Sequence, residues 1–122
     1  MPSTKTRWPK PAAQFTVPIY GGGVYLFTSQ AEYAQALAFL KQSPAREGVA
    51  GCARWLENQD TKDVMYMVGW FDKKPTTLVH EATHVALYIA EYVGFSPKAG
   101  GGEPFCYLLD TLLEKLGLDK PT

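Results

Sequence analysis

The chain has 122 residues, 12 basic and 12 acidic side chains, and a formal net charge of zero. Its length suits one hydrophobic core, and an apolar content of 46% with 13% aromatic residues excludes a disordered chain. The neutral balance gives no electrostatic reason to expect nucleic acid or an anionic membrane as a partner. The apolar runs are too short for a membrane span and no signal peptide is evident, so we expect the chain in the cytoplasm.

The first part of the chain predicts an arm and a β-hairpin. Residues 1–13 hold three prolines and three basic side chains, so we expect an extended arm before a single domain over residues 14–117, with a short tail at 118–122. Two β-rich runs flank the glycines at 21–23 and predict the hairpin. Pro18 cannot donate a ladder hydrogen bond, so its strand belongs at a sheet edge or is interrupted there.

The middle of the chain predicts a helix and a second hairpin. Ser29 and Glu32 form a capping box, which opens a helix that stops at Pro44. Two further strands follow over residues 49–56 and 64–71, and the latter is apolar on both faces, as in a sheet interior. The expected fold class is therefore α+β, with a small antiparallel sheet of two hairpins packed against three helices.

The chemistry is concentrated at residues 80–84, where His-Glu-Ala-Thr-His matches the HExxH zinc-binding pattern. Residues four apart share one face of a helix, so the imidazoles of His80 and His84 can converge on one ion. Glu81 lies about 100° further round the helix, beside the ligands, where a general base for a bound water is needed. Both histidines of the chain fall in this motif. We therefore expect a Zn²⁺ site on a helix that begins at Pro75.

A third protein ligand is needed, since catalytic zinc usually keeps three protein ligands and one open position. Leu87 and Ala90 stand where the metzincin pattern requires glycine and histidine, which excludes that class. Glu103 is the best candidate, because it opens a predicted helix over 103–116 behind three glycines that can turn the chain back. Its alternative role is that of an acidic residue favoured at a helix N-terminus. Two thiolates are the other candidates, those of Cys52 and Cys106.

The HExxH motif followed by Glu103 resembles the gluzincin arrangement of thermolysin-like metallopeptidases, in which a following helix supplies the third zinc ligand. More narrowly, residues 78–89 and 102–109, after the strand end at 68–72, resemble small bacteriophage and prophage proteins over nearly the whole chain. The resemblance implies a zincin-like fold and a bacterial host cell. Tyr107 stands where gluzincins often place an aspartate.

The resemblance also implies a reaction, the hydrolysis of a peptide bond. Zinc-activated water would attack the carbonyl of a peptide or protein substrate, a host protein among the candidates, with Glu81 as general base. The developing oxyanion needs a donor, and Tyr107 is our first choice because it lies one turn from Glu103, with Tyr88 or Arg54 as substitutes. We expect the substrate to add to a sheet edge beside the site.

Two other functions fit the same residues. A zinc-stabilised, non-catalytic binding protein, for example a phage protein that antagonises a host factor, would keep the metal and need no base at Glu81. A purely structural domain, in which the motif is incidental, would need no metal. Replacement of Glu81 by Gln separates the first two functions, and replacement of His84 by Ala tests the third.

Overall fold

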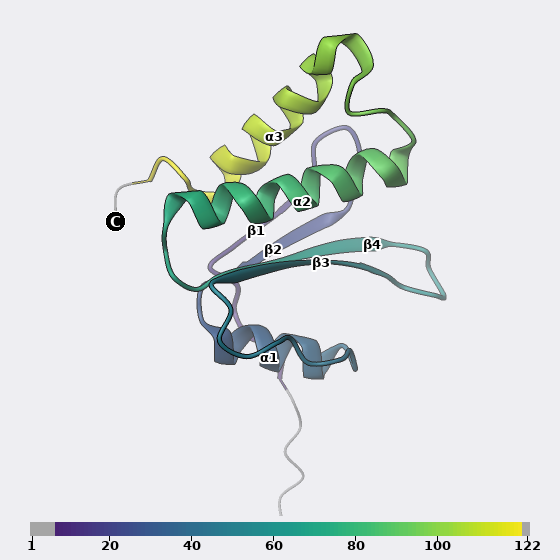
Figure 1. The fold of residues 1–122 in the computed structure, drawn as a ribbon. Helices are drawn as coiled ribbons and strands as arrows, with labels where there is room; N and C mark the ends of the chain where they lie inside the picture. Colours follow the sequence, from purple (N-terminus) through teal and green to yellow (C-terminus); the bar gives the residue numbers. More distant parts are fainter. Residues whose placement is uncertain (1–6, 121–122) are drawn as a thin grey trace, which may run out of the picture.

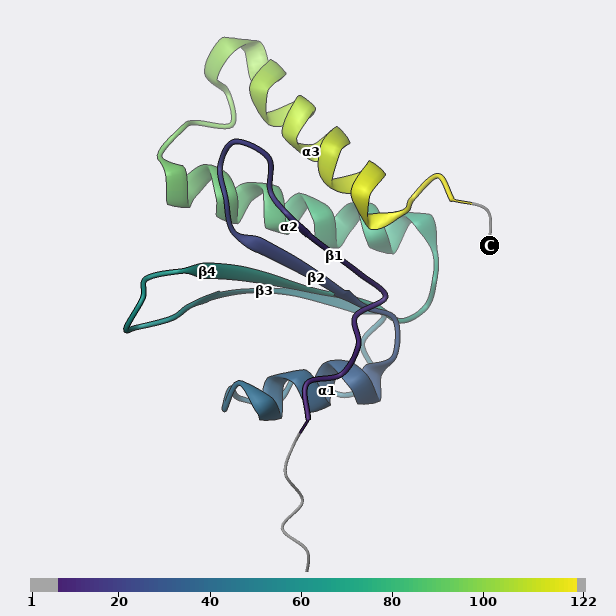
Figure 2. The same cartoon turned by 180° about the vertical axis from the view of Figure 1, so that it is seen from behind.

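The computed structural model describes residues 7–120, which form one four-stranded sheet between layers of helix (Figure 1). This arrangement confirms the α+β class. Helix α1 covers one face of the sheet, and α2 and α3 lie on the other, as both views show (Figures 1 and 2). The elements in chain order are β1 (Ala13–Thr16), β2 (Gly23–Phe27), α1 (Gln30–Phe39), β3 (Gly51–Glu57), β4 (Val64–Trp70), α2 (Pro75–Val93), the 3-10 turn η1 (Ala99–Gly102) and α3 (Glu103–Leu116).

The sheet is mixed, so the prediction of an antiparallel sheet is wrong at its centre. The strand order is β1-β2-β4-β3, with both hairpins antiparallel as expected and β2 parallel to β4. The chain leaves β2 through α1 and reaches the outer edge at β3. The turn after β3 then brings β4 back beside β2 in the same direction, because a parallel pair needs such a long crossover. The interior place of β4 is confirmed.

Short-range signals explain where the elements begin and end. The Ser29 hydroxyl accepts a hydrogen bond from the Glu32 backbone N–H at 3.3 Å and caps α1. Strand β1 ends at Thr16, before Pro18, and lies at a sheet edge as predicted. Gly94 ends α2 in the left-handed conformation, with a φ of 86° that costs a glycine little.

Part of the predicted arm packs on the domain. The Trp8 ring makes edge-to-face contacts with Tyr25, Phe27 and Phe39, at centroid distances of 5.5 to 5.8 Å. Residues 1–6 of the arm and 121–122 of the tail lie outside the described residues. Within residues 7–120, no helix is long and apolar enough to cross a membrane.

Helix α2 supplies most of the core on its side of the sheet. Its buried apolar side chains are at most 1% exposed, and each contributes up to about 2 kcal/mol when fully buried. They are Leu78, Ala82, Val85, Ala86, Ile89 and Ala90. Val79 and Val93 on the same helix lie outside this stripe and are 36% and 39% exposed. Burial of this stripe fixes the orientation of α2 about its own axis. This orientation determines the direction in which the HExxH side chains point.

Candidate metal centre

The helix that carries the motif is tied to β4 at its start. The Trp70 indole N–H donates to the Lys74 carbonyl oxygen at 2.8 Å. Asp72 accepts the Lys74 backbone N–H at 3.0 Å and the Thr77 hydroxyl at 2.8 Å, and these hydrogen bonds lower the pKa of the Asp72 carboxyl. Pro75, in the first turn of α2, has no backbone N–H and therefore needs no hydrogen-bond acceptor at that position. The first turn of α2 is therefore fixed relative to the sheet before the histidines are reached.

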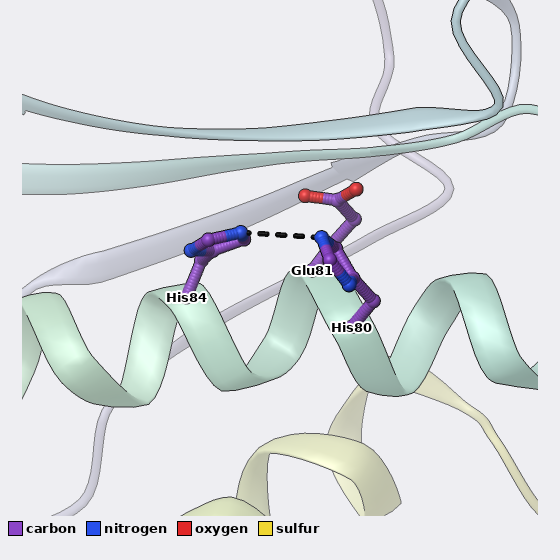
Figure 3. A group of neighbouring side chains, drawn as sticks. All are labelled: His80, Glu81 and His84. Carbon is purple, nitrogen blue, oxygen red and sulfur yellow. Dashed lines mark hydrogen bonds between the residues drawn. The ribbon is translucent and has the colours of Figure 1, made fainter.

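His80 and His84 converge as the motif predicts. Their Nε2 atoms lie 3.3 Å apart, and Figure 3 shows both rings on the side of α2 that faces the strands. Two nitrogens bound to one tetrahedral zinc, at about 2.0–2.1 Å each, lie roughly 3.3 Å from one another. The observed spacing therefore fits zinc. Without an ion, one Nε2–H donates to the other nitrogen.

Glu81 completes the group and is the one buried charged side chain among residues 7–120. The ligand atoms of His80, Glu81 and His84 all lie within 4.8 Å of one another. The Glu81 side chain is 7% exposed and extends toward the sheet (Figure 3). Burial raises the pKa of Glu81, and the nearby charges of His80 and His84 oppose that rise. A raised pKa makes this carboxylate a stronger proton acceptor than an ordinary glutamate.

Gly51 in β3 makes room for the carboxylate. A Cβ atom at position 51 would lie 3.2 Å from Glu81 Cγ, and 2.7 Å from both Thr77 Cγ2 and the Gly69 carbonyl oxygen. Gly51 was not among the residues predicted to belong to the site. A glycine inside a strand often marks such a close approach, so that signal was available.

The His80, Glu81 and His84 group lies beside the line along which β3 and α2 face each other, called here the seam. Two clefts lie along this seam. One, of about 390 Å³, is lined by residues 50–51 and by α2 residues that include His80 and Glu81. The other, of about 680 Å³, lies further along the same two elements. A molecule bound along this seam would reach the histidines from the solvent.

The structure does not bring Glu103 to this group. Within residues 7–120, the cluster of potential metal ligands contains His80, Glu81 and His84 alone. The start of α3 stands away from α2, which α3 approaches only toward its own C-terminal end (Figures 1 and 2), and in Figure 3 α3 lies on the opposite side of α2 from the histidines. Glu103 is exposed there.

The two cysteines are also apart from the group. Cys52 is partly buried on the face of the sheet that α1 covers, and Cys106 is exposed on α3.

The three predicted oxyanion donors occupy different places. Tyr107 is 66% exposed and lines a cleft with the loop between β1 and β2, away from the histidines. The Arg54 guanidinium donates to the Ser43 carbonyl oxygen at 2.7 Å. Tyr88 stacks on His84, with ring centroids 6.3 Å apart and planes at 21°. Of the three candidates, Tyr88 is therefore the one that lies beside the histidine pair.

Comparisons with known proteins do not identify a family for this arrangement. No protein-family model, curated protein or solved structure matches the chain. The resemblance to phage zincins therefore stays a prediction, and the function follows from the geometry of the His80, Glu81 and His84 group.

Proposed function

We propose that this protein is a minimal zinc-dependent peptidase that binds its metal through His80 and His84. The observation that carries the proposal is the 3.3 Å separation of the two Nε2 atoms beside a buried carboxylate. When bound, zinc would lower the pKa of a water to about 7 and polarise the substrate carbonyl.

Glu81 is the general base in this proposal. Its side chain is packed against Gly51 and buried, so the carboxylate has a defined position relative to both imidazoles. It takes a proton from the attacking water and returns it to the leaving amine. Burial raises the pKa of Glu81, which favours its acceptance of a proton from the water.

The free edge of β3 supports a peptide as the substrate. The Ala50 carbonyl oxygen accepts the Phe71 N–H at 2.9 Å, and Gly51 pairs with Trp70. Hydrogen-bonded pairs alternate in an antiparallel ladder, so Gly51, Ala53 and Trp55 direct their backbone groups away from β4. No strand of the described chain pairs with that side of β3. An extended segment can add there and pass beside Glu81.

A second function has one observation in its favour, the separation of Glu103 from the histidines. Only two imidazoles then bind the zinc, those of His80 and His84. The Glu81 carboxylate is close enough to them to serve as the third ligand. A zinc so bound would leave no base, and the protein would be a zinc-stabilised binding protein, such as an antagonist of a host factor.

Replacement of Glu81 by Gln distinguishes the two functions. We would measure zinc by elemental analysis and cleavage with fluorescein-labelled casein, an unfolded substrate. A peptidase should retain zinc in Glu81→Gln and lose about 10²-fold or more of its rate. Glu114→Gln, an exposed glutamate on α3, is the matched control and should match the wild type.

Three other results have distinct meanings. Zinc binding without cleavage by the wild type, together with zinc loss in Glu81→Gln, would favour the binding protein. Unchanged cleavage in Glu81→Gln would refute the role of Glu81 as base. Absence of zinc from the wild type would refute both functions.

A further inference from the structure

We propose that the larger cleft on the β3 and α2 seam binds an aromatic side chain of a peptide that pairs with β3. This inference deepens the function proposed above and rests on it for the identity of the ligand as a peptide. The cleft has a volume of about 680 Å³, within the usual range for ligand sites. Its walls are Ala53, Arg54 and Trp55 from β3, and Tyr88, Glu91 and Tyr92 from α2.

The cleft begins where the metal group ends. Tyr88 lies one helical turn after His84 on the same side of α2, and their rings stack at 6.3 Å. On the opposite wall, Gly51 lies against Glu81, and Ala53 and Trp55 follow along the strand. A ligand in this cleft would therefore be next to the reacting groups.

Aromatic rings dominate the walls and remain open to solvent. Trp55 is 39% exposed and Tyr92 is 45% exposed, although both are large apolar side chains beside the core. Ala53, two residues before Trp55 on β3, is small and leaves room for a ring. Another aromatic side chain would bury these surfaces and meet the rings in edge-to-face or offset stacking, which favours an aromatic over an aliphatic group.

The charges at the cleft do not select a charged ligand. Arg54 and Glu91 contribute to the cleft walls. Glu91 is exposed, so solvent screens its charge. The Arg54 guanidinium donates to the Ser43 carbonyl oxygen at 2.7 Å, in the loop after α1, so this charge is already engaged away from the cleft. A lysine or aspartate side chain would therefore lose hydration without a dedicated partner.

The strand register sets the distance between this side chain and the scissile bond. Side chains of a strand added to β3 would point alternately toward α2 and away from it. Gly51 and Ala53 are two residues apart, or about 7 Å along the strand. We therefore expect the aromatic residue two or three positions from the carbonyl that lies beside Glu81.

Peptide binding to zinc-loaded Glu81→Gln protein tests the inference without turnover. Fluorescein-labelled peptides of Gly, Ser and Ala, each with one Phe, Leu, Lys or Asp or with none, would be titrated by fluorescence anisotropy. The Phe peptide should bind about tenfold more tightly than the Lys, Asp or unsubstituted peptides, with Leu between them. Added as second changes, Trp55→Ala and Tyr92→Ala should each abolish this preference.

Phe39→Ala is the matched control. Phe39 is 46% exposed, like Tyr92, but lies on α1 across the sheet. It should leave the Phe preference intact. Circular dichroism of each variant checks the fold, and Trp55→Phe, which keeps an aromatic wall, should retain the preference even if Trp55→Ala does not fold.

The inference and the proposed function fail in different ways. A preference for Lys or Asp, a Phe preference that survives Trp55→Ala and Tyr92→Ala, or no binding by any peptide at about 1 mM would overturn the cleft assignment. Cleavage by the wild type without an aromatic preference would overturn the cleft assignment and leave the peptidase intact. Phe-selective binding without wild-type cleavage would support the cleft assignment and count against the peptidase.

Discussion

Zinc should stabilise this protein through the two histidines and without Glu103. A ligand at a free concentration 100 times its Kd, bound only by the folded state, contributes about 2.7 kcal/mol. For 122 residues, the entropy of unfolding is about 0.26 kcal/mol/K, so this amount corresponds to a rise in Tm of about 10 °C. The Nε2 atoms of His80 and His84 lie 3.3 Å apart, so both must contribute to the bound state.

The assay is a set of thermal melts by circular dichroism, with and without zinc. His80→Ala and His84→Ala should each lose most of the 10 °C rise. Glu103→Ala should keep all of it, because Glu103 is exposed and is not part of the ligand group. Without zinc, Glu103→Ala should match the wild type to within about 0.5 kcal/mol. Magnesium, which prefers oxygen ligands, is the metal control and should produce no comparable rise.

Two outcomes would refute this reasoning. Loss of the zinc-induced rise in Glu103→Ala would mean that α3 brings its first residue to the histidines, contrary to the observed separation of the two helices. A wild-type Tm that zinc leaves unchanged, with no zinc retained after gel filtration, would mean that the close histidine pair is not a metal site.

Three other substitutions test the structure around the site. Gly51→Ala would place a Cβ atom 2.7 Å from the Gly69 carbonyl oxygen, so we expect urea melts to show a loss of about 1–3 kcal/mol, together with weaker zinc binding. Leu112→Ala, at a fully buried position of α3, should cost about 2–5 kcal/mol in the same assay; a loss below 1 kcal/mol would contradict the packing of α3 on α2. The Asp72 pKa is lowered chiefly by the Lys74 backbone N–H, so its stabilising contribution exists above the ordinary value of 3.8 and is lost as pH falls through the lower folded-state value. Asp72→Asn should remove this part of the acid dependence of Tm, and an unchanged dependence would show that the hydrogen bonds of Asp72 to Lys74 and Thr77 contribute nothing.

Local sequence determined much of this protein. The histidine spacing, the Ser29 cap, Pro75 at the start of α2 and Gly94 at its end act over one or two turns of chain, and the structure has the start of α1 and both ends of α2 at these residues. The predicted end of the first helix at Pro44 is wrong, because α1 ends at Phe39. Both hairpins follow for the same reason, since a short turn between two β-rich runs pairs neighbours in sequence.

The tertiary structure alone decided the pairs that are distant in sequence. The parallel pairing of β2 with β4 depends on where the crossover through α1 returns, and no short motif specifies that return. Glu103 is a plausible ligand by spacing, but the packing of α3 on the far side of α2 takes it away from the histidines. The burial of Glu81 required Gly51 from another element. Such contacts arise from how the apolar faces of helices and sheet pack together, and this packing is a property of the whole chain.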